Sequence, residues 1–550
     1  MDASFRLILG LPGQGMLLHL DTLSLFFIVL LLPQIMAASL AGMRTSCGFW
    51  LLVVGMVLAL LADGAFALIF GLGLIGVTSW CLAARAGVRE ASVCAGLVVF
   101  VLGCLIPALA LPVSSLAFGL VVLGVGAISG LLPCCRWLPP AAPLLPEAVA
   151  GLMSGGGVNI AFYILIRYVF MTAAHAQQPW WGDVLMALGA LAMISGALRA
   201  ALEVDLREVL AWTTIATAGL IAMALGIALH ASISGDLRLS GLALQAALLC
   251  ILAHGLFKPL LFIGAGEVRR AVGTTSLNWL GGLMRGMPRT GILMLLGAVG
   301  LAALPLGPAF APLFLLVHAV IALALQGGVS ACFGCAVLLA VLGLGGALLL
   351  AAAVKIIGLG FLGRPRSLHA AAAEDARPGP FWGMALLGVL CLPLALVPGP
   401  ILFFCAPVIN LLTPLARTTP LTYAPLTLCL LAVLALLVAG IVQMRRGDRG
   451  LRDVQAWNGG FGQPPAWLPF GDPQTQISAS GFVAPLMGAC GRMITCNPAE
   501  RFLLSPLWRL YAQGVRLARR VGHLPARLWL ACLFTVLLLA LLIFDLARGG

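Results

Sequence analysis

The chain has 550 residues, of which 62% are hydrophobic and 9% are charged, and its mean hydropathy is +1.12. Soluble globular proteins carry about 25% charged residues, so this composition excludes a cytosolic enzyme and indicates many membrane spans of about 20 residues each. The net charge of +13 comes from 31 Lys and Arg residues. Lysine occurs only at Lys258 and Lys355, and both lie inside apolar stretches.

The other basic side chains are arginines, most of them in short loops or at the ends of apolar segments. This distribution sets membrane topology and contacts lipid headgroups. No nucleic-acid-binding motif accompanies it, so we predict contact with membrane lipid and no nucleic-acid partner. The cysteines are scattered through apolar segments, and the C-x-x-C pair Cys332 and Cys335 has no second pair at metal spacing. We therefore predict no metal site and no disulfide framework.

Apolar runs follow one another with mostly short loops between them, without the alternation that is typical of a membrane barrel. The sequence predicts an all-α polytopic membrane protein with about 14–15 transmembrane helices. The first run is too long for a signal-peptide core, so we expect a span there. The apolar segments are 17–40, 48–62, 64–84, 91–112, 114–134, 147–172, 182–201, 209–230, 240–263, 288–306, 308–326, 330–361, 380–398, 422–444 and 527–546.

The one sizeable polar region, 445–526, is rich in Gly, Pro and Arg. We expect a membrane-surface segment there, followed by an anchoring helix at 527–550. Glycines also gather inside two spans, at 124–130 and at 343–346. They indicate either helices that are interrupted at a transport site or helices that pack closely together, and the sequence leaves both readings open.

The strongest functional pattern is AHGLFKP at 253–259. His254 and Lys258 are four residues apart, so they share one helical face. A charge near the bilayer centre costs at least ~2.5–3.5 kcal/mol, and buried Lys and His, unlike Arg, can exchange protons. Pro259 lacks an N–H and frees the Gly255 carbonyl, which offers a site for water. We predict a proton relay; the alternative is that Lys258 extends from a helix end to the headgroups.

Two more ionisable residues lie in apolar segments. Lys355 stands nine residues before Arg364, about 13 Å along a helix, so it is either functional or extends part of the way to the interface. His318 is isolated and is either a relay or a hydrogen-bonded structural residue. Acidic residues next to apolar runs predict helix caps or interfacial positions. They are Asp21, Asp63, Glu203 and Asp205.

No phosphate loop, nucleophile–base pair or cofactor fingerprint occurs, so we predict no cofactor and no redox chemistry within this chain. Several stretches instead have the pattern of one known superfamily. They are LHLDTLSLFF (18–27), MVLALLADGAF (56–66), WLPPAAP (137–143), DLREVLAWTTI (205–215), HGLFKPLLFIGAGEV (254–268), LGGLMRGMPRTG (280–291), VKIIGLGFLGRPRS (354–367), AWNGGFGQPP (456–465) and SASGFVAPL (478–486). With them the chain resembles the antiporter-like membrane subunits of complex I, Mrp antiporters and group 4 hydrogenases, above all the large membrane subunit of the formate hydrogenlyase and hydrogenase-4 type (hydrogenase-4 component B-like).

The resemblance implies two inverted five-helix repeats with discontinuous helices, and a line of buried Glu, Lys and His residues that moves protons as an attached redox module turns over. It divides the chain into N-terminal helices shortened relative to the family (1–90), a degenerate first repeat (91–230), a second repeat (231–400), additional helices (401–444), the surface segment (445–526) and the anchoring helix (527–550).

Carried over residue by residue, the resemblance assigns His254, Lys258 and Lys355 to ionisable positions of the family, and His318 is a further relay candidate. Other expected ionisable residues are replaced. The replaced positions are Gly73, Ile128, Cys135, Asn159, Ala216, Cys250 and Leu313. The first repeat has thus lost its titratable centre, whereas the second keeps most of its own.

We therefore expect a proton-translocating subunit of a group 4 hydrogenase-like or NADH:quinone oxidoreductase-like complex in the cell inner (plasma) membrane, with an impaired first half-channel. The implied partners are other membrane subunits and a peripheral redox arm, hydrogenase-like or NADH/formate dehydrogenase-like, with iron–sulfur proteins. The alternative is a non-conducting structural or anchoring subunit of the same kind of complex. A stand-alone cation/proton antiporter is disfavoured, because the acidic pair site that it would use is missing.

Overall fold

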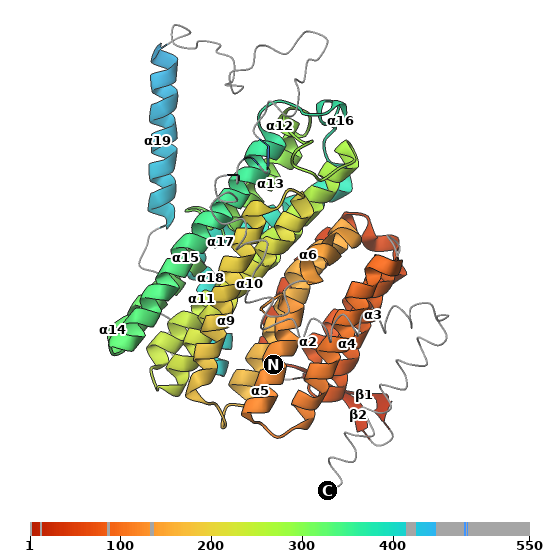
Figure 1. The fold of residues 1–550 in the computed structure, drawn as a ribbon, viewed down its shortest axis with the longest axis vertical. Coiled ribbons are helices and arrows are strands. Elements are labelled where there is room, and N and C mark those ends of the chain that lie inside the picture. Colours follow the sequence, from red (N-terminus) through yellow and green to blue (C-terminus); the bar gives the residue numbers. More distant parts are fainter. Residues whose placement is uncertain are drawn as a thin grey trace.

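The computed structural model describes residues 3–11, 14–84, 88–132, 137–413 and 425–446, together with Ser478, Ala479, Gly481 and Ala484. Most of this part of the chain is helical (Figure 1). Within it, eight helices are long and apolar enough to cross a membrane, and the shorter apolar helices have 10–17 residues. The chain is therefore an all-α, multi-pass membrane protein, as hydropathy predicts. The expected inverted repeats stay a prediction.

The chain opens with an antiparallel hairpin, β1 (Ala3–Leu11) and β2 (Gln14–Leu20), which hydropathy does not predict. Met16 and Leu18 pack against the start of α3 and the residue after α2, so the first residues of the expected 17–40 span belong to a strand. The helix starts later because the Asp21 carboxylate accepts a 2.7 Å hydrogen bond from the Ser24 N–H. Asp21 is thus a helix cap, as predicted, whereas Asp63 is exposed in a loop and caps no helix.

The first helix is α1 (Thr22–Leu40), and the helices after it build one side of the bundle (Figure 1). They are α2 (Cys47–Leu61), α3 (Ala65–Ala83), α4 (Val88–Ala110), α5 (Ser115–Ser129) and α6 (Leu138–Ala141). The next span is irregular, because π-helical turns interrupt it. It consists of α7 (Glu147–Leu152), the π-turn η4 (Met153–Gly157), α8 (Val158–Ile166) and the π-turn η5 (Arg167–Thr172).

The rest of the described bundle follows in chain order. It comprises α9 (Pro179–Leu202), α10 (Leu206–Ile233), α11 (Leu237–Val272), α12 (Leu283–Gly286), α13 (Pro288–Leu301), α14 (Phe310–Gln326), α15 (Val329–Lys355) with the π-turn η6 (Ile356–Phe361), α16 (Leu368–Ala371), α17 (Pro378–Leu396) and α18 (Pro398–Leu412). The last described helix, α19 (Pro425–Arg446), stands outside the bundle (Figure 1). The predicted anchoring helix and most of the predicted surface segment lie outside the described residues.

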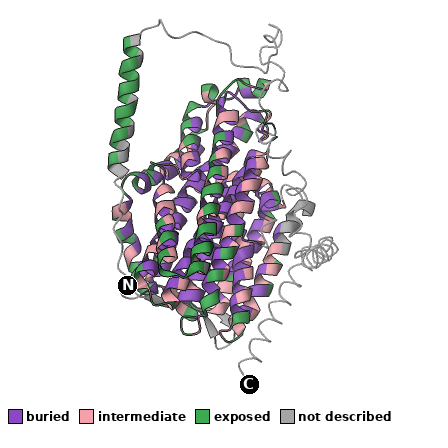
Figure 2. Cartoon of the chain, turned by 60° about the vertical axis from the view of Figure 1, so that its left-hand side comes forward, coloured by how far each residue is buried: buried purple, intermediate pink, exposed green. Residues whose placement is uncertain are grey.

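Helices α9 and α10 pack closely against each other. A Cβ atom added to Gly189 would lie 2.6 Å from the Gly219 carbonyl oxygen, and one added to Gly219 would lie 2.4 Å from that of Gly189. Figure 2 shows buried residues inside the bundle and exposed ones on its outer surface. Large exposed side chains there include Leu325 and Phe403, which suit contact with lipid.

The sequence allows two readings of the clustered glycines, interrupted helices or close packing, and in the structure these glycines do not interrupt a helix. α15 is continuous through Gly343–Gly346, and a Cβ atom at Gly345 would press on Met193 of α9. α5 simply ends at Gly130, which has a left-handed φ of 79°. Close packing and helix termination therefore explain these glycines, and the irregular turns lie elsewhere, in the π-turns and in the bend between α13 and α14.

Candidate functional site: a buried lysine and histidine in the bundle core

Helix α11 carries the candidate relay through the centre of the bundle. The window of α11 that is most apolar is completely buried, and the helix continues through Pro259 to Val272. Its start is capped by Asp236. Burial alone would raise the pKa of Asp236, but hydrogen bonds from the Leu239 N–H, the Gln326 side chain and the Arg238 N–H, together with the Arg238 charge, hold that pKa below its usual value.

Lys258 is fully buried, which excludes a side chain that extends to the headgroups. Its ammonium group donates to the Leu210 carbonyl oxygen at 3.0 Å and to Thr213 Oγ1 at 2.6 Å, both on α10. Among the described residues, no carboxylate forms an ion pair with it. The lysine charge is therefore held by neutral oxygens alone.

His254 lies one turn before Lys258 and is also fully buried. Its Nε2 lies 2.9 Å from the Ser154 carbonyl oxygen, which can only accept, so Nε2 carries a hydrogen. Its Nδ1 lies 2.9 Å from the Thr217 hydroxyl, which in turn is 3.0 Å from the carbonyl oxygens of Thr213 and Thr214. The Thr217 hydroxyl can thus donate to a neutral ring, or accept from a protonated ring while it donates to its own helix. Both states of His254 are fully hydrogen-bonded.

A row of hydroxyls on α10 connects these groups. Thr213 contacts the lysine, Thr217 contacts the histidine, and the Thr214 hydroxyl lies 2.7 Å from the Ser154 hydroxyl between them. These residues were not among the sequence-based candidates. The signal that could have found them is the T-T-x-x-T spacing. It places the hydroxyls on one face of α10, beside the H-x-x-x-K face of α11.

The π-turn η4 places Ser154 against α11. A Cβ atom at Gly155 would lie 2.8 Å from the Pro259 ring, and one at Gly151 would lie 3.0 Å from the Pro259 Cα. Only glycine fits such contacts without a shift of backbone. The S-G-G-G run at 154–157 therefore lets this irregular span pack directly on the proline turn of α11.

Lys355 is buried as well, but it lies apart from this network. Its ammonium group donates to the carbonyl oxygens of Ala200 (2.9 Å), Ala201 (2.7 Å) and Glu203 at the C-terminal end of α9. Its ammonium group thus extends to the end of α9 between Arg199 and Arg207, part of the way to the interface, and is buried there. Lys355 caps this helix end, where the dipole favours a cation.

His318 does not join the buried groups. Its ring is exposed on the outside of α14, where Nδ1 lies 2.9 Å from the Phe314 carbonyl oxygen and the ring packs 4.2 Å from that of Phe314. Asp205 caps α10 through the N–H groups of Arg207 and Glu208, as predicted. Glu203 follows the end of α9.

Three of the replaced family positions, Ile128, Cys250 and Leu313, line two cavities beside the network. Cys250 and Leu313 border a cavity of about 20 Å³ next to His254 and Thr217, which reaches α15 at Gly346. Since one water needs roughly 10–15 Å³, this cavity has room for a water molecule.

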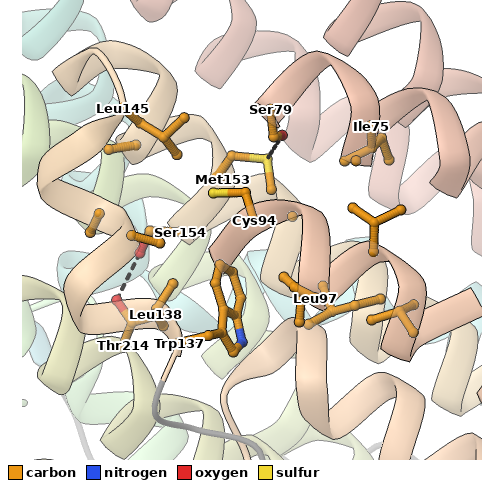
Figure 3. A pocket seen from close by; sticks show the side chains of 18 of the residues that line it. Ile75, Ser79, Cys94, Leu97, Trp137, Leu138, Leu145, Met153, Ser154 and Thr214 are labelled. Atoms are coloured by element: carbon orange, nitrogen blue, oxygen red, sulfur yellow. Dashed lines mark hydrogen bonds between the residues drawn. The ribbon is translucent and has the colours of Figure 1, made fainter. Parts of the chain in front are cut away.

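Ile128 borders the other cavity, of about 70 Å³, which is apolar except near Ser79 and the Ser154–Thr214 pair (Figure 3). Gly73 lies on α3 with open space around its Cα, and Asn159 is buried on α8. Ala216 is buried in α10, and Cys135 lies outside the described residues.

Comparison with known proteins agrees with this arrangement. Residues 108–340 match the family described as NADH:quinone oxidoreductase/Mrp antiporter, TM. Hydrogenase-4 component B of Escherichia coli K12 is 27% identical over 573 aligned residues, covering 93% of this chain and 81% of that protein. An uncharacterised Mycobacterium tuberculosis protein is 35% identical over 286 residues, or 52% of this chain, and the match spans less than half (44%) of that protein.

The fold matches that of a chain in an archaeal respiratory membrane complex, the membrane-bound sulfane sulfur reductase. The TM-score is 0.73 at 19% identity, over 98% of this chain and 92% of the other. At this identity the likeness shows the fold alone. The family match over residues 108–340 and the similarity to hydrogenase-4 component B support the assignment of the chain to the superfamily of antiporter-like membrane subunits of NADH:quinone oxidoreductases, Mrp antiporters and group 4 hydrogenases.

Proposed function

We propose that the chain moves protons through His254 and Lys258 as a membrane subunit of a group 4 hydrogenase-like or complex I-like oxidoreductase. The observation that carries this proposal is the pairing of a fully buried lysine, held only by neutral oxygens, with a histidine whose two ring nitrogens are both hydrogen-bonded. A charge in such a place costs several kcal/mol, and a purely structural role does not require a lysine there.

The second half of the subunit would provide the connection toward α15. The cavity of about 20 Å³ beside His254 supports this, because it reaches α15 and can hold a water molecule next to the ring. Lys355, nine residues beyond Gly346 on the same helix, would act as a fixed positive charge near the path rather than as a carrier, since all its recorded partners are carbonyl oxygens.

The route through the first half toward α3 and α4 would conduct poorly or not at all. Where a lysine is expected, Ile128 borders an apolar cavity, and apolar cavities of this kind stay dry. Protons would therefore not pass from Ser154 and Thr214 toward α3 and α4. The repeat boundaries at 91–230 and 231–400 are part of this proposal.

We further propose that the subunit resides in the inner (plasma) membrane with other membrane subunits and a peripheral redox arm, as the names of its relatives suggest. One end of the bundle holds most arginines of the described loops and helix ends. They are Arg44, Arg199, Arg207, Arg269, Arg270, Arg285, Arg289, Arg364, Arg366 and Arg377, whereas Arg167 and Arg238 lie at the other end. The positive-inside rule places the arginine-rich end in the cytoplasm.

The test is proton flux into vesicles that contain the full-length chain, driven by an imposed potassium diffusion potential. Lys258→Ala, and the size-matched Lys258→Met, should abolish the flux. Ser129→Ala is the matched control, because the Ser129 hydroxyl is buried but bonds only to its own helix, at Val125. Equal flux for wild type and Lys258→Ala would overturn the proposal.

The second candidate is a non-conducting subunit that spaces or anchors a partner complex. Gly73 and Ile128 favour it, because neither residue can titrate where the family carries a Glu or a Lys. It predicts that a chain with both Lys258→Ala and Lys355→Ala restores growth to a deletion strain. Proton transport predicts that this chain fails although it assembles into the complex.

A further inference from the structure

Two buried amide side chains in the bundle core have acceptor oxygens without donors. Gln34 on α1 is 1% exposed and Asn159 on α8 is 3% exposed. Among the described residues, none donates a hydrogen bond to Gln34 Oε1 or to Asn159 Oδ1. A buried polar atom without a partner costs about 1–3 kcal/mol, and buried polar groups of this kind are commonly satisfied by water.

Both amides converge on one turn of α11. A Cβ atom placed on Gly255 would lie 2.7 Å from Asn159 Nδ2 and 2.8 Å from Gln34 Nε2. Gly255 immediately follows His254, and its carbonyl group lacks the usual helix donor because Pro259 has no N–H. Two amide groups from two helices therefore lie against the Gly255 turn with their nitrogen atoms, beside the relay histidine, and Gln34 Oε1 lies next to the π-turn η4, 2.9 Å from a Cβ atom added to Gly155.

A polar stripe on α8 leads from this point to one end of the bundle. Asn159, Tyr163 and Arg167 follow at intervals of four residues, so they share a helical face, with about 6 Å per step. The Tyr163 hydroxyl lies 3.0 Å from the Ser24 hydroxyl, and Arg167 forms an ion pair with Asp21 at the end of α1. That end is opposite the arginine-rich end.

We propose that Gln34, Asn159 and the Gly255 turn bind water, and that this water connects His254 to the Tyr163–Arg167–Asp21 stripe. The stripe then forms the proton connection to the membrane face opposite the arginine-rich end. The water site stands on the orphan oxygens alone, whereas its role in transport rests on the proposed function.

The water site is tested by X-ray radiolytic footprinting of the full-length chain in H₂¹⁸O, because hydroxyl radicals from bound water modify the nearest side chains. Leu30 lies against Gly255, with its Cδ1 3.1 Å from the added Cβ atom. Leu30, which is 4% exposed, should gain ¹⁸O about tenfold or more faster than Leu52, which is 0% exposed. The double variant Gln34→Met and Asn159→Leu should remove the difference. Equal rates for Leu30 and Leu52 in the wild type would overturn the site.

The role in transport is tested with the same variant in the vesicle assay. The double variant should lower the proton flux about tenfold or more, which corresponds to about 1.4 kcal/mol of added barrier, while Ser129→Ala and the melting temperature stay at wild-type values. The single variant Asn159→Leu, which should show a smaller loss, covers the case in which the double variant does not fold. Abolished flux in Lys258→Ala with wild-type flux in the water-site variants would overturn the connection and leave the proposed function standing. Equal flux in wild type and Lys258→Ala would instead overturn the proposed function.

Discussion

The hydrogen bond between Lys258 and Thr213 gives a sharp prediction, because Thr213→Val removes one oxygen and keeps the shape of the side chain. Thr213 Oγ1 is one of only two recorded acceptors of the buried ammonium group, at 2.6 Å. A hydrogen bond to a charged group contributes about 1.5–3 kcal/mol. If that stabilisation is lost when the proton arrives at Lys258, the flux should fall roughly 10- to 100-fold, at about tenfold per 1.4 kcal/mol.

The measurement is the initial rate of vesicle acidification under an imposed potential, normalised to folded protein by size-exclusion chromatography. Thr78→Val is the control, because the Thr78 hydroxyl is buried but bonds only to Leu74 and Ile75 of its own helix. It should keep the wild-type rate. If Thr213→Val acidifies vesicles at the same rate as Thr78→Val, the idea that neutral oxygens on α10 hold the proton at Lys258 is refuted.

Three further predictions concern stability and topology. Lys355→Met should lower the unfolding free energy by about 2 kcal/mol, which is the contribution of a favourable charge at a helix end, and the melting temperature checks this. The proton flux per folded protein should stay largely intact in the vesicle assay. For Asp375, burial works against ionisation, but hydrogen bonds from the Thr290 side chain and from the N–H groups of Ala376, Thr290 and Arg289 keep its pKa below the usual value. Its stabilising contribution is therefore full above about pH 4, the pKa of an unfolded Asp, and is lost as the pH falls through the lower pKa of the folded state. The stability gap between wild type and Asp375→Asn should close on acidification, and a gap independent of pH would contradict this reasoning. On intact spheroplasts, an impermeant maleimide should label His175→Cys but not His369→Cys, and the wild-type chain gives the background labelling. The reverse pattern would contradict the proposed orientation.

Hydropathy was sufficient to predict most of the fold, because a helix that crosses lipid must be both long and apolar. The spans around α9 and α10 lie within about three residues of their predicted bounds, whereas α11 continues nine residues beyond its predicted end at 263. Asp205 and Asp236 start helices as capping residues do. The hairpin before Asp21 was missed, because the leucines at the end of β2 run on into the apolar helix that follows. Only pairing between β1 and β2 distinguishes them, and pairing is not a local property of the sequence.

The candidate site was predicted in part. Four-residue spacing on one helix was enough to place His254 beside Lys258. Their partners could not be found in the same way, because Thr213, Thr217 and Ser154 come from other helices, and their proximity depends on the way α10 and the π-turn pack on α11. For the same reason, the sequence left the role of Lys355 open, and only the packing of α9 on α15 shows what surrounds this side chain.

The partners of the two lysines explain why one suits a carrier and the other a fixed charge. Lys355 faces three carbonyl oxygens, which only accept, so a neutral amine with two hydrogens and a lone pair would leave one of them without a donor and its own lone pair unused. Lys258 faces one carbonyl and one hydroxyl, and the Thr213 hydroxyl can turn and donate to the amine once its extra proton has left. The site around Lys258 therefore offers partners to both protonation states, namely two acceptors for the ammonium group, whose third N–H has no oxygen acceptor among the described residues, and one donor for the lone pair of the amine. A carboxylate partner would favour the charged state alone, so its absence beside Lys258 is consistent with a residue that must release its proton in every cycle.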